Sequence, residues 1–145
     1  DMPQSADIVV LNAYPKDYKL FQAINALNVI LYPNMNIVRP GGTVVLAAAC
    51  PEGEGLHFLC SPGMSKSLWF ADSSFEGRDV VIYSPNLNRY QVRRHFSANV
   101  DLFASWEDVL VRLVERHGEE ASVTVFPCAT VQLNESSTQV RSSNA

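Results

Sequence analysis

The sequence IVVLNAYPKD at residues 8–17 decides the fold class. It joins a run of β-branched, apolar residues to a polar turn that contains proline, and residues 18–31 then repeat apolar side chains at helical spacing. An uninterrupted apolar strand that leads at once into a helix is typical of a parallel sheet, whose strands are covered on both faces. We therefore predict a strand at 7–11 and a helix that starts at Tyr18, with the Asp17 carboxylate as its cap.

The same alternation of strand and helix continues along the chain. Further strands are expected at residues 43–49, 79–83, 100–103 and 122–126, with 131–133 either extending the last one or pairing near it. Pro40-Gly41-Gly42 is expected to form a turn before the second strand, and residues 87–95 a short helix. These elements predict an α/β domain over residues 1–133: three layers, a mostly parallel sheet with helices on both faces (Rossmann-like), followed by a polar tail at 134–145.

The clearest predicted helix lies between Ser105, a good N-cap, and Gly118, a good C-terminal stop. Asp108, three residues after the serine, is expected to complete a capping box. Helical spacing predicts one buried stripe, made of Trp106, Val109, Leu110, Leu113 and Val114. His117, in the last turn, is expected to be a cation that complements the helix dipole.

Composition excludes several classes of function. The chain has 145 residues and a formal net charge of −4, which argues against a nucleic-acid partner. It has no apolar run of the roughly 18 residues that a membrane span needs and no visible secretory signal, so no membrane partner is expected. Three cysteines at irregular spacing indicate reduced thiols and a cytoplasmic location. The start at Asp1 and the polar tail suggest a piece of a longer protein.

Three loops are expected to meet at the carboxyl ends of the parallel strands, where α/β proteins bind ligands. They are residues 12–17, 50–57 and 84–89, and they are rich in hydrogen-bonding side chains. Glu52 and Glu54 lie in the second loop and are candidates for a wall of the cleft. The three loops together suit a small polar ligand but do not contain a complete catalytic set.

The familiar catalytic and cofactor-binding motifs are absent. No Gly-x-Gly-x-x-Gly follows the first strand, no phosphate-binding loop is found, and no Gly-x-Ser-x-Gly elbow is found. Cys50, His57 and Cys60 lie close in sequence, but a structural zinc site needs a fourth ligand, so we predict no metal site. His95 follows two arginines and is expected to be exposed.

Several segments, in order, resemble the C-terminal domain of the nickel-pincer lactate racemase family. The matching segments are Ala6-Asp7-Ile8-Val9-Val10, Tyr14-Pro15-Lys16-Asp17, Phe21-Gln22-Ala23, Val38 to Thr43, Ala49 to Gly53, Ala104 to Leu110 and Ala121 to Pro127. Where this chain has Tyr-Pro-Lys-Asp and Phe-Gln-Ala, the family typically has Tyr-Pro-x-Asp and Tyr-Gln-Ala. The chain departs from the pattern where Asn12-Ala13 replaces a frequent Gly-Gly.

The resemblance implies a domain that closes over the substrate of a two-domain enzyme. The family's enzymes interconvert D- and L-2-hydroxy acids on a nickel-pincer nucleotide held by their N-terminal domain. This chain would then bind no cofactor, have no catalytic residue and be inactive alone, with a cofactor-bearing N-terminal domain and a small 2-hydroxy acid as partners. Gln22 matches the family's substrate-side glutamine, and Asn25 stands where the family has a lysine. The implied substrate-binding residues are Gln22, Asn25, Tyr14, Lys16 and Asp17.

Two other functions stay open. The same crevice suits a non-catalytic domain that binds a small ligand or a partner protein, with Phe58, Trp69 and Phe70 at an interface rather than in a core. A nicotinamide-dependent oxidoreductase fits the fold class, but the missing glycines argue against it.

Overall fold

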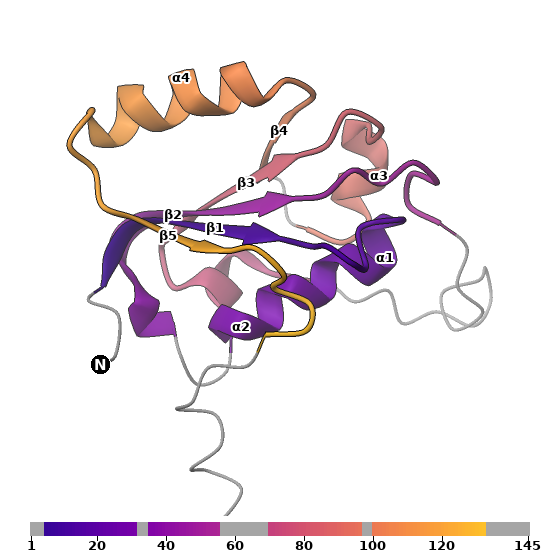
Figure 1. Ribbon diagram of the computed structural model, residues 1–145, viewed down its shortest axis with the longest axis horizontal. Coiled ribbons are helices and arrows are strands. Elements are labelled where there is room, and N and C mark those ends of the chain that lie inside the picture. The colour runs from indigo at the N-terminus through magenta and orange to yellow at the C-terminus, as the bar shows by residue number, and fades with distance from the viewer. Residues whose placement is uncertain (1–4, 32–34, 56–69, 97–99, 133–145) are drawn as a thin grey trace, which may run out of the picture.

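A computed structural model describes residues 5–31, 35–55, 70–96 and 100–132. Its five strands form one parallel sheet in the order β4-β3-β2-β1-β5 (Figure 1). The strands are β1 (Ala6–Asn12), β2 (Val38–Ala47), β3 (Asp79–Tyr83), β4 (Val100–Phe103) and β5 (Val123–Phe126). The predicted α/β class and parallel sheet are confirmed.

The strand order determines which face of the sheet each connection covers. From β1 to β4 the chain steps across the sheet in one direction, and right-handed crossovers place those connections on one face. The return from β4 to β5 runs the other way, so its helix covers the opposite face. The first face carries α1 (Leu20–Ala23), η1 (Ile24–Leu27), α2 (Asn28–Leu31), η2 (Met35–Ile37), η4 (Asp72–Phe75) and α3 (Arg89–Arg93). The opposite face carries α4 (Trp106–His117), which confirms helices on both faces (Figure 1).

Alternate residues of the strands enter two separate cores. On the α1 face, Val9, Leu11 and Ile82 pack with the buried side chains of the helices. Phe70 also packs there, 5.2 Å from Phe96 between ring centroids, so it is not the interface residue that one alternative predicted. Phe58 and Trp69 lie outside the described residues.

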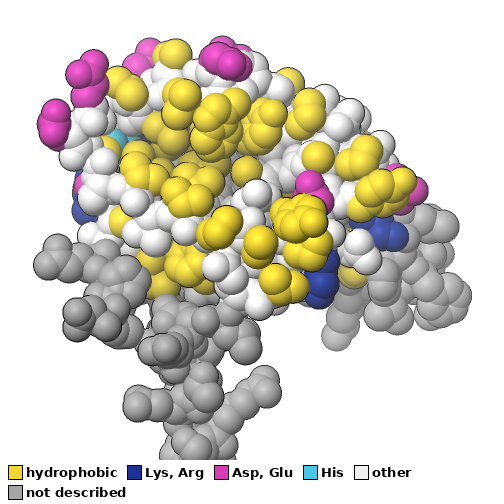
Figure 2. All heavy atoms as spheres, in the orientation of Figure 1, with side chains coloured by type: hydrophobic (Ala, Val, Ile, Leu, Met, Phe, Trp, Pro, Cys, Tyr) yellow, Lys and Arg dark blue, Asp and Glu magenta, His cyan; other side chains and the backbone are white. Residues whose placement is uncertain are grey.

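The core beneath α4 is smaller, because α4 packs over β3 and β4 and leaves β5 partly uncovered. Val109 and Leu113 are buried, but Leu110 and Val114 are 47% and 46% exposed, so the predicted five-residue stripe is wrong at these two positions. Val123 and Val125 of β5 are exposed as well. Figure 2 shows the hydrophobic side chains that gather on this side of the molecule.

The first helix differs from its prediction at its beginning. It starts at Leu20 rather than Tyr18, and Lys19 at the N-cap makes no side-chain capping bond. Instead, the backbone N–H groups of Leu20 and Phe21 donate to the carbonyl groups of Gly53 and Glu54, at 2.9 and 3.3 Å. The loop after β2 therefore does what the Asp17 carboxylate was expected to do, and the prediction that Asp17 caps this helix is wrong.

Other boundaries also shift. Pro40-Gly41-Gly42 lies inside β2 as an irregularity, because the pairing with β1 jumps from Ala6–Val38 to Ile8–Thr43. Ser105 and Gly118 bound α4 as predicted, with the Asp108 N–H bonded to Ser105 Oγ at 3.4 Å, but the Asp108 side chain does not complete the predicted capping box. The predicted short helix becomes α3, capped by Asn88. Residues 131–132 form no strand.

Asp7 joins β1 to β2 and to the residue before β5 at the amino end of the sheet. Its carboxylate accepts hydrogen bonds from the backbone N–H and Oγ of Ser122, at 2.8 and 2.6 Å, and pairs with Arg39. The bonds from Ser122 and then from Arg39 hold the pKa of Asp7 well below its usual range. Residues 115 positions apart in the chain are linked here.

Candidate functional site

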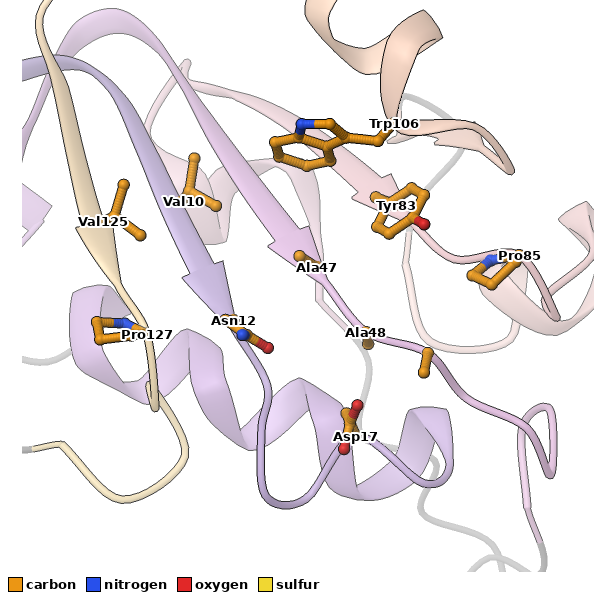
Figure 3. Close-up of a pocket in the computed structure, with 11 residues that line it drawn as sticks. Val10, Asn12, Asp17, Ala47, Ala48, Tyr83, Pro85, Trp106, Val125 and Pro127 are labelled. Atoms are coloured by element: carbon orange, nitrogen blue, oxygen red, sulfur yellow. The ribbon is translucent and has the colours of Figure 1, made fainter.

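A cavity of about 410 Å³ opens at the carboxyl end of the sheet, on the side of α4 (Figure 3). Its walls come from the ends of β1, β2, β3 and β5 and from the first residue of α4. The lining residues are Val10, Asn12, Asp17, Ala47, Ala48, Ala49, Tyr83, Pro85, Trp106, Val125 and Pro127. Residues that follow the first three strands therefore meet at one crevice, although no described residue of the predicted loop 50–57 lines it.

Three polar side chains line the cavity: Asp17, Asn12 and Tyr83. The Asn12 Oδ1 atom accepts a hydrogen bond from the Tyr14 backbone N–H at 3.1 Å, which orients the amide and leaves its NH₂ group as a donor. Within the described part of the chain, the Asp17 carboxylate makes no hydrogen bond or ion pair. The cavity therefore offers an acceptor carboxylate and a donor amide against largely apolar walls (Figure 3).

An aromatic pair forms the wall beneath α4. The rings of Tyr83 and Trp106 meet edge to face, with centroids 5.4 Å apart and planes at 76°. Tyr83 is the last residue of β3 and Trp106 is the first residue of α4, so both lie at an end of their element. From the sequence, Tyr83 was predicted to lie in a strand and Trp106 in a buried helical stripe, and neither was proposed for the site.

The predicted substrate-binding residues separate into two groups. Asp17 lines the cavity, whereas Gln22 and Asn25 lie on the α1–η1 segment under the other face of the sheet and do not line it. The Asn25 side-chain amide donates to the Gln22 carbonyl oxygen at 3.0 Å, a local bond that competes with helical backbone bonds where α1 passes into η1. Tyr14 and Lys16 are exposed in the turn after β1. The role of these residues in substrate binding stays a prediction.

The two carboxylates predicted to line a cleft have different surroundings. Glu52 is exposed. Glu54 is largely buried, and its two oxygens lie 3.0 Å from Arg94 Nη1 and 3.0 Å from His95 Nε2, so it joins the β2 loop to the end of α3. His95 is 1% exposed, which contradicts the expected exposed histidine. Its Nδ1 atom is buried and has no hydrogen-bond partner among the described residues.

The described thiols and histidines are not arranged to bind a metal. Burial raises the pKa of the Cys50 thiol to about 12, so this sulfur is a poor thiolate ligand. No group of three or more His, Cys, Asp or Glu residues that could hold a metal ion is found in the described ranges. His57 and Cys60 lie outside those ranges.

His117 is not the cation that its position in α4 suggested. Its Nε2 atom lies 2.7 Å from Thr43 Oγ1, and its Nδ1 atom lies 3.5 Å from Arg39 Nη2. Desolvation first, and then the nearby charges of Arg116 and Arg39, lower the pKa of this histidine. The neutral ring is therefore favoured, and His117 links α4 to β2 as a hydrogen-bonding group.

None of the helices described here is long and apolar enough to cross a membrane.

Comparison with known proteins gives a likeness in fold. No protein-family model matches the sequence, and no curated protein matches it significantly. Among solved structures, the lactate racemase apoprotein from Thermoanaerobacterium thermosaccharolyticum is similar, with a TM-score of 0.59 and 17% sequence identity. The likeness covers 90% of this chain and 36% of that chain, so this chain spans little more than a third of the racemase. At this identity the match shows a shared fold.

Proposed function

We propose that this chain is the substrate-side domain of a two-domain, lactate racemase-like protein that acts on 2-hydroxy acids. The observation that carries the proposal is the match of nearly the whole chain to about a third of a lactate racemase. The ordered sequence segments from β1 to β5 point to the same family. The chemistry would belong to a cofactor-bearing N-terminal domain, and this domain alone would be inactive.

The described residues do not fit the nickel-pincer nucleotide of that family. Nickel needs accessible nitrogen or thiolate ligands, whereas Cys50 is a buried thiol and His95 is enclosed beside Glu54. We therefore assign this domain a part in holding the substrate and no part in holding the cofactor.

The proposed substrate contacts are Gln22, Asn25 and the exposed turn with Tyr14 and Lys16. A 2-hydroxy acid brings a carboxylate, for which the Lys16 ammonium and the Gln22 amide are suitable partners. Asn25 contributes less than the family's lysine would, because it is neutral and its NH₂ group already donates to Gln22. Reduced charge at this position favours a substrate other than lactate itself.

Chiral chromatography of D- and L-2-hydroxy acids incubated with the isolated chain tests the division of labour. No interconversion is expected, and racemisation by the chain alone would contradict the proposal. In the full-length, cofactor-loaded protein, Gln22→Ala should raise the KM for a 2-hydroxy acid several-fold, and Gln22→Glu should raise it further, because the new carboxylate repels the substrate. A KM that responds to neither substitution would remove Gln22 from the substrate site.

A non-catalytic protein-interaction domain is the second candidate. The exposed apolar side chains on α4 and β5 favour it: Leu110, Val111, Val114, Val123 and Val125. An interaction domain predicts that the paired change Val123→Thr and Val125→Thr abolishes binding to a partner. The racemase proposal predicts instead that Gln22 controls activity, so the two readouts separate the candidates.

A further inference from the structure

We propose that the cavity beside Trp106 binds a protonated organic amine with a flat apolar body. This site lies apart from Gln22 and Asn25, and the inference does not depend on the racemase proposal. It rests on the charge of the cavity, the hydrogen-bonding groups that face it and the aromatic pair that lines it.

The charge of the lining favours a cation. Asp17 contributes a carboxylate without a hydrogen-bond or ion-pair partner in the described ranges, and no Lys, Arg or His is among the lining residues described. An unpaired carboxylate beside apolar walls gains most from a charged N–H donor, whose hydrogen bonds are about twice as strong as neutral ones. A ligand carboxylate placed there would instead be repelled.

The beginning of α4 does not reverse this preference. A helix N-terminus attracts anions through its unpaired N–H groups. Here Ser105 Oγ already accepts from the Asp108 N–H, and two acidic residues, Glu107 and Asp108, occupy the first turn. The positive end of the helix is therefore already matched by negative groups of the chain itself.

The shape and surface of the cavity favour an aromatic body on the amine. Tyr83 and Trp106 offer ring surface, and three small residues, Ala47 to Ala49, leave room above the strand ends. A volume of about 410 Å³ is in the range of small-molecule sites, roughly 300–1,000 Å³. Aromatic rings also attract a cation held near their faces.

The test compares three probes of nearly equal shape: 2-phenylethylammonium, 2-phenylethanol and 3-phenylpropionate. Each is titrated into the isotopically labelled chain, and NMR shifts of the Ala48, Ala49 and Tyr83 amides report binding. The ammonium is expected to bind about tenfold more tightly than the alcohol, and the carboxylate more weakly than either.

Two variants identify the charge responsible. Asp17→Asn keeps the size of the side chain and should reduce ammonium binding about tenfold, to the level of the alcohol. Glu52→Gln removes an equal charge from an exposed position outside the cavity and should leave binding unchanged. Circular dichroism checks that both variants fold.

Each other result overturns the inference. Equal binding of the three probes would show an apolar cavity without selection for a cation. Preference for the carboxylate, ammonium binding unchanged by Asp17→Asn, or no shifts at the three amides would each refute the site as proposed.

Discussion

Replacing Glu54 by alanine tests whether this carboxylate is part of a cleft or part of the framework. The sequence placed it with Glu52 in a possible cleft loop, whereas the structure joins its oxygens to Arg94 and His95. If the structure describes its role, loss of the carboxylate should destabilise the whole domain. If it is a free ligand-binding group, stability should barely change.

The expected loss of stability follows from the two contacts. The His95 side chain is 2% exposed, so removing its carboxylate partner leaves a buried polar group unpaired, at a cost of roughly 1–3 kcal/mol. The Arg94 side chain is 44% exposed, and its ion pair contributes about 0–1 kcal/mol. The sum is about 1–4 kcal/mol, which lowers the Tm by roughly 2–16 °C in a domain of this size.

Urea unfolding followed by circular dichroism measures this change directly. Glu52→Ala is the matched control, since that carboxylate is exposed, and it should stay within about 0.5 kcal/mol of the parent chain. Arg94→Ala isolates the exposed ion pair and should cost at most about 1 kcal/mol. The reasoning fails if Glu54→Ala and Glu52→Ala unfold at the same urea concentration with the same m-value.

Three further predictions follow from the packing. The lowered pKa of His117 means that the unfolded chain binds the proton more readily. The free energy of unfolding should therefore be highest above about pH 7.5 and fall below about pH 6.5, by at most ~1.4 kcal/mol per pH unit. Urea unfolding at pH 7.5 and 5.5 measures this difference, which should be smaller in His117→Gln. Cys50, with its pKa raised to about 12, should resist iodoacetamide at pH 8 in the native state, while the partly exposed Cys128 reacts. Mass spectrometry of the labelled peptides measures both reactions, and faster labelling of Cys50 than of Cys128 would contradict the prediction. Gly42→Ala should cost about 1–3 kcal/mol, because the added Cβ would lie 2.7 and 2.9 Å from two backbone oxygens; an unchanged Tm would show that the strand irregularity opens easily.

Much of the fold could be predicted from local patterns. The strand at Asp79–Tyr83 and the limits of α4 were predicted correctly, because continuous apolar runs, Ser105 and Gly118 act through neighbouring residues. The start of α1 could not be predicted in this way, since its N–H groups bond to carbonyl groups more than 30 residues away. Pro40 to Gly42 looked like a turn because local sequence does not show that β1 pairs on both sides of the irregularity.

The candidate site was predicted less well than the fold. The meeting of strand-end residues follows from a parallel sheet, and Asp17, in the first of the predicted loops, lines the cavity. Periodicity marks the apolar side of α4 but not which strands it covers, so Leu110 and Val114 were placed in a core that does not extend to them. Tyr83 and Trp106 were missed because apolar periodicity marks both as buried but does not show that they lie beside a cavity. An aromatic residue at the last position of a strand, beside a polar loop, is the signal that would have identified Tyr83.

The position of β1 between β2 and β5 has a consequence for synthesis on the ribosome. One neighbour of β1 emerges soon after it, but the other is formed by residues 123–126, after most of the domain has been made. Until then β1 is itself the edge strand of the sheet, and Asp7 has no Ser122 to bind. A nascent chain arrested before residue 122 should therefore be sensitive to protease and prone to association through that edge, and release of the last strand should end both properties.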